Sequence, residues 1–240
     1  MGLDGHGHDL PQSGSRAWEV AMAEMGRTEI LTRYRHLRAI STHHHNEALR
    51  FVPDSALMEQ ARRLGLTVGK MLVAESLDEV TLAYDLALYT APPGRSRGME
   101  RYVRHAAAAP GSDEDVMLQA LLRARFSVWR VERRHETAGL VVLDLMRQEE
   151  VWLVDEHLEQ TAHPGTSLAM RLSTPEAFAM TCGVVVPVDA EMMEEVFDTM
   201  LERVHGDADA IANDRRFATA IYRIAVMDAL MSLVRFADPD

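Results

Sequence analysis

The chain has 240 residues, of which 47% are hydrophobic and 26% charged, a composition typical of globular proteins that bury a sizeable core. Its net charge of −12 disfavours nucleic-acid binding, because neutralising phosphates needs a surplus of Lys and Arg. A single cysteine, Cys182, excludes a disulfide within the chain and a cysteine-based zinc site. Without a long apolar run or a secretory leader pattern, the sequence predicts a cytoplasmic protein that does not enter a membrane.

The first half of the chain shows helical periodicity. Residues 1–14 are rich in Gly, His, Asp, Pro and Ser, which predicts a disordered tail. In residues 15–124, apolar side chains recur every three to four positions, and this spacing predicts a helical domain. Residues 67–74 fit either a short helix or a strand. The expected helices are separated by Pro and Gly and cover 27–50, 77–89, 99–108 and 113–124, with Ser76 and Ser112 as the caps of the second and the last of these. Another helix is expected between the first two, capped by Asp54 or Ser55 and ended by Gly65.

The period changes in the middle of the chain. From about residue 125 to residue 188, apolar residues alternate with polar ones, as expected for strands with one face buried. Five or six short strands in so few residues predict a small antiparallel β barrel or a coiled sheet. The expected strands cover 126–131, 140–145, 151–154, 167–172 and 178–186.

Helical spacing returns in residues 189–240. Asp189 can cap an amphipathic helix, and the last helix is expected over residues 213–236. We therefore expect an α+β fold with a helical N-terminal half, the small β unit in the middle, and C-terminal helices that pack back on one or both.

A His-rich helical segment is the first candidate for chemistry. His44 and Glu47 are three positions apart and share a helix face, where an imidazole and a carboxylate can bind a divalent metal or exchange a proton. Asp85 and Asp228 both lie on apolar helix faces, where an ionised carboxylate requires a partner. His44, Tyr84, Tyr222 or an arginine could supply it. If the acids and the imidazole converge, they form a metal or acid–base site. If they do not, separate hydrogen bonds fix the helix packing.

Two further patterns concern macromolecular partners. Trp129, Arg130, Arg133 and Trp152 combine aromatic and arginine side chains, a mixture found in recognition patches and equally at a sheet edge packed on the acidic helix expected after Asp189. The Ala-x-x-x-Gly spacing within residues 61–65 fits either a helix-turn-helix or an ordinary helix with a glycine C-cap.

No catalytic signature stands out among these motifs. The uneven charge distribution and Met-rich amphipathic helices favour a non-enzymatic binding or regulatory protein that acts through protein partners or self-association. The alternative is a metal-dependent or acid–base enzyme that uses His44, Glu47, Asp85 and Asp228, with a divalent metal as its cofactor. A weaker alternative is a nucleic-acid-binding regulator that uses residues 55–74.

Overall fold

A computed structural model describes residues 25–201, 204 and 207–228 of the chain. It is a mixed structure, 50% helical and 20% strand, which confirms the α+β class. The tail expected at residues 1–14 and the end of the last expected helix, from residue 229, lie outside the described residues.

Helices precede the sheet, and their ends follow the capping residues closely. The Ser76 hydroxyl accepts a 3.3 Å hydrogen bond from the Glu79 N–H and so caps one helix, while Gly65, with a φ of +84°, ends the helix before it. These five helices are α2 (Arg27–Leu49), α3 (Asp54–Leu64), α4 (Leu77–Tyr89), α5 (Gly98–Val103) and α6 (Asp113–Leu122).

A short β-hairpin connects α3 to α4. Its strands are β1 (Thr67–Val68) and β2 (Met71–Leu72). Gly69 opens the two-residue turn with a φ of +63°, the conformation that a type II′ hairpin turn requires at this position. The helix-turn-helix interpretation is therefore wrong, because a hairpin stands where the second helix would begin. The helix with a glycine C-cap is confirmed.

The middle of the chain forms one antiparallel sheet. Its two edges approach each other at one isolated bridge, between Leu153 and Ala179, the residue just before the last strand. Closing a barrel requires a continuous hydrogen-bonded ladder between the edges, so the barrel prediction is wrong and the sheet is open. In the spatial order β5-β4-β3-β6-β7, the strands are β3 (Arg125–Arg134), β4 (Leu140–Asp144), β5 (Glu149–Leu153), β6 (Ser167–Ser173) and β7 (Met180–Val188).

Helices also follow and interrupt the sheet. A short helix between β5 and β6 was not expected from the sequence, although the Asp155 carboxylate caps it by accepting hydrogen bonds from the N–H groups of His157 and Leu158. The remaining helices are α7 (Glu156–Thr161), which is this inserted helix, α8 (Ala190–Leu201), α9 (Ala208–Asn213) and α10 (Arg215–Met227).

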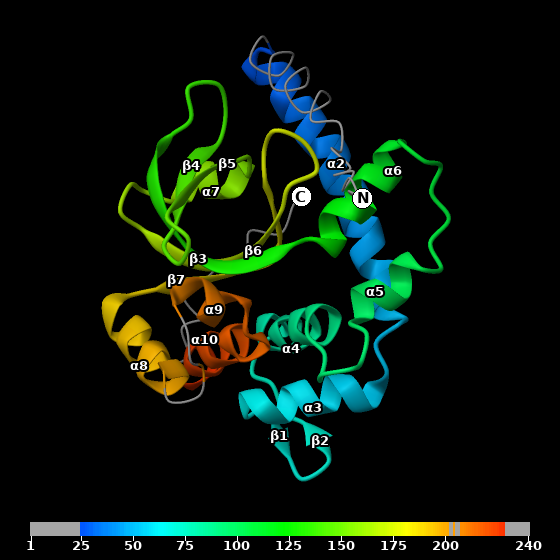
Figure 1. The fold of residues 1–240 in the computed structure, drawn as a ribbon, viewed down its shortest axis with the longest axis vertical. Helices are drawn as coiled ribbons and strands as arrows, with labels where there is room; N and C mark the ends of the chain where they lie inside the picture. The colour runs from blue at the N-terminus through cyan, green and yellow to red at the C-terminus, as the bar shows by residue number, and fades with distance from the viewer. Residues whose placement is uncertain (1–24, 202–203, 205–206, 229–240) are drawn as a thin grey trace, which may run out of the picture.

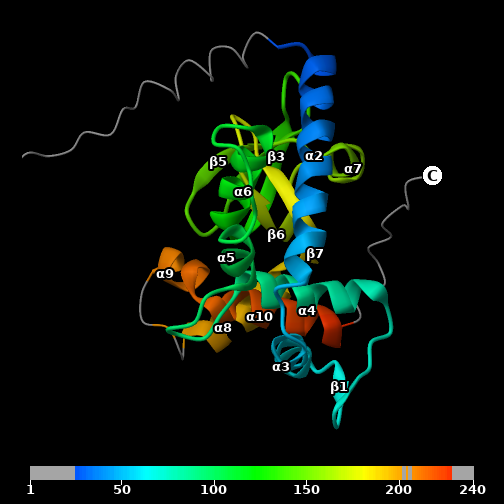
Figure 2. The same ribbon diagram turned by 90° about the vertical axis from the view of Figure 1, so that its right-hand side faces the viewer.

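Both helical regions share hydrophobic cores with the sheet. The long helix α2 runs along one side of the sheet and packs with α5, α6 and the start of β7 (Figure 2). Helices α3, α4, α8 and α10 form a second core with β3, β6 and β7 at the other end of the molecule (Figure 1). A third core lies between the sheet and α7. None of the helices in the described part of the chain has the length and apolar character needed to span a bilayer.

Candidate anion-binding site

A pocket of about 590 Å³ opens where the two helical regions meet the sheet. Its walls are the end of α4 with the loop that follows, the junction of α6 and β3, the β4–β5 turn, and the junction of α9 and α10. Asp214 is the only acidic residue among the described residues that line it. The lining includes seven arginines: Arg95, Arg97, Arg123, Arg125, Arg147, Arg171 and Arg215. A concentration of positive charge like this is unexpected in a chain of net charge −12.

The arginine at the floor of the pocket has a buried partner. Two nitrogens of Arg171 donate to the two carboxylate oxygens of Asp85, each at 3.0 Å, and the Tyr222 hydroxyl donates to the same carboxylate at 3.1 Å. The guanidinium also lies over the Tyr89 ring, 4.3 Å from its centroid. Because these groups satisfy the charge of Arg171, this residue holds β6, α4 and α10 together.

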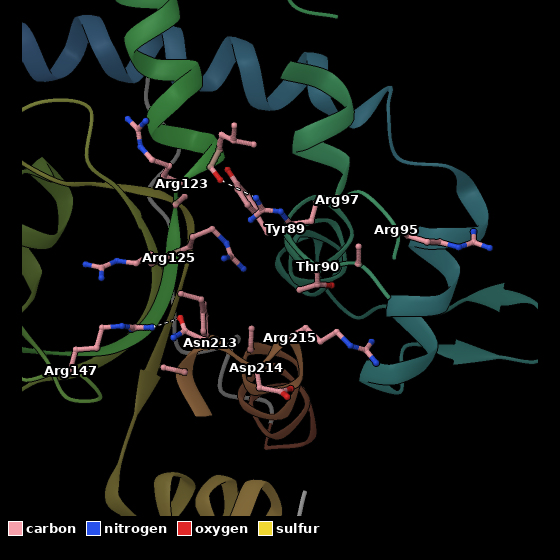
Figure 3. A pocket seen from close by; sticks show the side chains of 17 residues that line it. Tyr89, Thr90, Arg95, Arg97, Arg123, Arg125, Arg147, Asn213, Asp214 and Arg215 are labelled. Atoms are coloured by element: carbon pink, nitrogen blue, oxygen red, sulfur yellow. Dashed lines mark hydrogen bonds between the residues drawn. The ribbon is translucent and has the colours of Figure 1, made fainter. Parts of the chain in front are cut away.

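A second arginine is anchored beside the β4–β5 turn. Arg147 forms ion pairs with Asp144 at 3.1 Å and with Asp209 at 2.7 Å. It also donates to the Asn213 side-chain oxygen at 2.8 Å, a hydrogen bond that Figure 3 shows. Asp144 is buried and also accepts from the Ser127 hydroxyl. These contacts attach α9 to the sheet and fix one wall of the pocket.

Two more arginines have weaker partners. Arg97 pairs with Glu100 at 2.7 Å and donates to the Leu122 carbonyl at 3.2 Å, which fixes the loop after α4 against the end of α6. Arg125 lies 3.5 Å from Glu149, but both side chains are about half exposed. Such a solvated pair contributes little free energy, so it leaves Arg125 able to turn toward a ligand.

Three arginines of the rim have no such partner. The guanidinium groups of Arg95, Arg123 and Arg215 form no hydrogen bond or ion pair with any residue that the structure describes. Figure 3 shows their guanidinium groups extending outward from the rim. Asp214 is one carboxylate among these charges, and Arg216 already donates to it at 2.8 and 2.9 Å, so it cannot offset all three. The pocket therefore carries an excess of positive charge that a bound anion can neutralise.

The pocket lining lacks the groups of acid–base chemistry. Among the described residues, it contains no His, Cys, Lys or Glu. The pKa of Asp214 is lowered by its hydrogen bond from Arg216 and further by the charge of Arg215, so this carboxylate stays ionised at neutral pH. Burial raises the pKa of the Tyr89 hydroxyl well above its usual value. The arrangement suits binding of an oxyanion better than proton transfer.

The residues of the expected metal site lie apart. The His44 Nδ1 is 2.7 Å from the Tyr102 hydroxyl, while its Nε2 is buried without a hydrogen-bond partner in the described part of the chain. Burial lowers the pKa of His44, so the ring is neutral at pH 7. Glu47 pairs with Arg50 at 2.7 Å on the surface of α2.

The two acids are separated from these residues as well. Asp85 is paired with Arg171 and Tyr222. Two of the partners that the sequence allowed for it, an arginine and Tyr222, are therefore confirmed. Asp228 is exposed at the C-cap of α10. No group of three or more His, Cys, Asp or Glu side chains within the described residues could hold a metal ion. Convergence of the four residues is therefore wrong, because Asp85 is paired with Arg171 and Tyr222, Glu47 is paired with Arg50, and Asp228 is exposed.

The four residues of the expected recognition patch are also divided. Trp129 is 1% exposed and donates its indole N–H to the Met170 carbonyl at 3.1 Å, so it belongs to the core and cannot join an exposed patch. Trp152 is partly buried and donates to the Ala138 carbonyl at 2.7 Å. Nearby acids of the sheet form ion pairs with the two arginines, Arg130 with Glu132 at 2.7 Å and Arg133 with Glu150 at 3.0 Å.

The arginine pocket was missed in the sequence because its lining comes from distant segments. Its only local signals are short arginine-rich stretches at 95–97, 123–125 and 215–216. Taken separately, each stretch predicts only an exposed loop or helix end. Arginine carries almost all the positive charge of this chain, whose single lysine is Lys70, so an arginine-rich stretch does not by itself indicate a site. Only the fold brings the three stretches together.

The comparison with protein families identifies the family of this chain but not its function. The chain belongs to a family described as "Family of unknown function (DUF7986)", which matches residues 28–227. This range includes every residue that lines the pocket. No curated protein and no solved structure matches the chain.

Proposed function

We propose that this protein is a non-enzymatic binding or regulatory protein whose arginine pocket binds a small oxyanion with more than one negative charge, such as a phosphorylated metabolite. The observation that carries the proposal is the presence of Arg95, Arg123 and Arg215, without ion-pair partners among the described residues, around a pocket that contains one acid. The planar guanidinium group donates paired hydrogen bonds that match the oxygens of phosphate and carboxylate.

A binding role fits the chemistry of the lining. Arginine stays protonated at every physiological pH, so it can attract and orient an anion but cannot take up a proton from it. The paired residues Arg147 and Arg171 give the pocket a fixed wall and floor, while the rim arginines are free to close on a ligand. This combination of a rigid base and an adaptable rim supports recognition of a small ligand.

Titration calorimetry with pyrophosphate tests the proposal. We expect saturable binding that weakens with added salt, and about tenfold weaker binding for Arg123→Ser or Arg215→Ser, because each removes a charge-assisted contact. Arg50→Ser is the matched control, since Arg50 is an exposed arginine at the C-cap of α2 that does not line the pocket. Absence of binding, or equal weakening by the control, would contradict the proposal.

A separate surface supports the self-association that the sequence favoured. Large apolar side chains are exposed on the β1–β2 hairpin and just after it: Val68, Met71, Leu72, Val73 and Leu77. Leu77 is 79% exposed and Met71 is 67% exposed, and the hairpin projects from the end of the molecule farthest from the sheet (Figures 1 and 2). Apolar surface of this kind marks an interaction site.

We propose a second copy of the chain as the occupant of this hairpin surface. The hairpin has only two strands, so an outer edge of each is available, and identical edges are complementary to each other across a two-fold axis. Light scattering over a wide concentration range should show a dimer that Met71→Glu dissociates, whereas Lys70→Glu in the turn leaves it intact. A monomer at all concentrations would contradict this second proposal.

A further inference from the structure

A second basic pocket lies on the other side of α10. Its volume is about 720 Å³, and residues of α3, α8 and α10 line it. Glu195 is the one acidic residue in its described lining, against the five arginines Arg62, Arg63, Arg215, Arg216 and Arg223. Arg63 pairs with Glu59 and Arg216 with Asp214, but Arg62 and Arg223 have no ion pair with a described residue.

The two pockets share one residue. Arg215, the first residue of α10, lines both of them. From there, Thr219 and Arg223 follow at intervals of four residues, so all three side chains lie along one face of the helix. The apolar side chains of Phe217, Ile221 and Ile224 lie on the opposite side of the helix, where they are buried. One face of α10 is therefore built into the core, and the other continues the basic surface from the first pocket into the second.

The length of this basic surface exceeds the reach of a single tetrahedral anion. Arg215 and Arg223 are eight residues apart, which corresponds to about 12 Å along a helix axis. The arginines without a described ion-pair partner are distributed along the whole path: Arg95, Arg123, Arg215, Arg62 and Arg223. A ligand that neutralises all of them must be extended and must carry several negative charges along its length.

We propose that the ligand is a linear polyphosphate chain, which fills the first pocket and continues past Arg215 along α10 into the second. This inference rests on the proposed function of the first pocket. Each unit of such a chain carries a negative charge and oxygens that accept paired hydrogen bonds from a guanidinium group. Such a chain therefore matches the extent of the basic surface and the hydrogen-bonding chemistry of the arginines.

The lining favours polyphosphate over single-stranded nucleic acid. Proteins that bind single strands supply exposed aromatic rings on which bases stack. The aromatic residues in the described lining of both pockets are Tyr89 and Phe126, which are only 5% and 6% exposed and pack in the core. The pockets therefore offer positive charge without a stacking platform.

The test compares a short and a long phosphate chain on the full-length protein. Affinities for pyrophosphate and for a polyphosphate of defined length are measured by calorimetry for the wild type, for Arg62→Gln/Arg223→Gln, for Arg123→Gln and for the control Arg50→Gln. We expect the double variant to lose most of the extra affinity for the long chain, about tenfold, while its pyrophosphate affinity is unchanged. We expect Arg123→Gln to weaken both ligands.

The outcomes separate this inference from the proposed function. One outcome is that pyrophosphate binds the first pocket while the double variant keeps the full preference for the long chain. In that case the preference comes only from the larger number of phosphate groups on the long chain, and the extended site is overturned. If neither phosphate binds, the proposed function itself fails. If an oligothymidylate or poly-glutamate of equal charge binds more tightly than polyphosphate, the assigned ligand class is overturned.

Discussion

Two kinds of arginine meet in one pocket, and their partners separate their roles. Arg171 is buried, paired with Asp85 and packed on the Tyr89 ring, so its charge is satisfied inside the protein. Arg123 and Arg215 are exposed and have no described ion-pair partner. Residue type alone therefore does not identify a binding site. What identifies it is positive charge that the protein has gathered and left without a counter-ion.

The buried ion pair between Arg171 and Asp85 should make the larger contribution to the stability of the fold. Replacing Asp85 with Leu leaves the Arg171 charge buried and unpaired, and we expect a loss of about 3–5 kcal/mol in the free energy of unfolding, measured with urea. Glu47→Gln removes an exposed partner of Arg50 and should cost less than about 1 kcal/mol. The double variant Asp85→Leu/Arg171→Met should recover much of the loss. If Asp85→Leu is as stable as Glu47→Gln, the buried pair does not hold these elements together.

The same buried network should make stability depend on pH. The His45 Nδ1 donates to the Ser41 carbonyl, so in the neutral ring its Nε2 accepts from the Tyr89 hydroxyl at 2.8 Å. Burial lowers the pKa of His45 to about 4, from about 6.5 in the unfolded chain. The unfolded state therefore binds the proton more tightly than the folded state. The contribution of neutral His45 to the free energy of unfolding is fully present above pH 6.5 and is lost as the pH falls toward 4.

Urea unfolding at pH 7 and pH 5 measures this effect. The shift of the pKa corresponds to a contribution of up to about 2 kcal/mol at pH 5. His45→Gln keeps a hydrogen-bonding side chain without the titration, so the difference between the two pH values should shrink in this variant. An unchanged difference would assign the pH dependence to other groups.

Substitutions at the rim of the pocket should change ligand affinity and leave the stability of the fold almost unchanged. Arg123→Gln removes an exposed side chain without a described partner, so we expect a change of less than about 0.5 kcal/mol in the free energy of unfolding. Its effect should appear in the affinity for pyrophosphate instead. A clear loss of stability in this variant would mean that Arg123 has a structural role, and the contrast with Arg171 would disappear.

The sequence predicted much of the secondary structure because the determinants are local. The helix over 77–89 was expected with its serine cap, and the alternation after residue 125 located the strands. The inserted helix α7 was missed because its six residues are too few to show a period. The openness of the sheet could not be predicted either, since closure depends on how far the edges approach in space.

The other features that the sequence did not predict depend on partners far apart in the chain. The sequence indicated that Asp85 requires a partner, yet Arg171 is 86 residues away, and only the fold selects it from 24 arginines. The expected metal site failed for the same reason, because spacing within α2 places His44 near Glu47 but says nothing about Asp85 or Asp228. The arginine pocket depends on the junctions of several elements, which no local pattern encodes.

The most direct test of the central claim is a crystal structure of the full chain soaked with tungstate, a heavy oxyanion that is visible by its anomalous scattering. We expect a strong anomalous peak inside the first pocket, between the β4–β5 turn and the start of α10, with rim arginines such as Arg123 or Arg215 turned inward to contact it. Tungstate bound only elsewhere on the molecule, with the pocket empty, would contradict the assignment of this pocket as an anion-binding site.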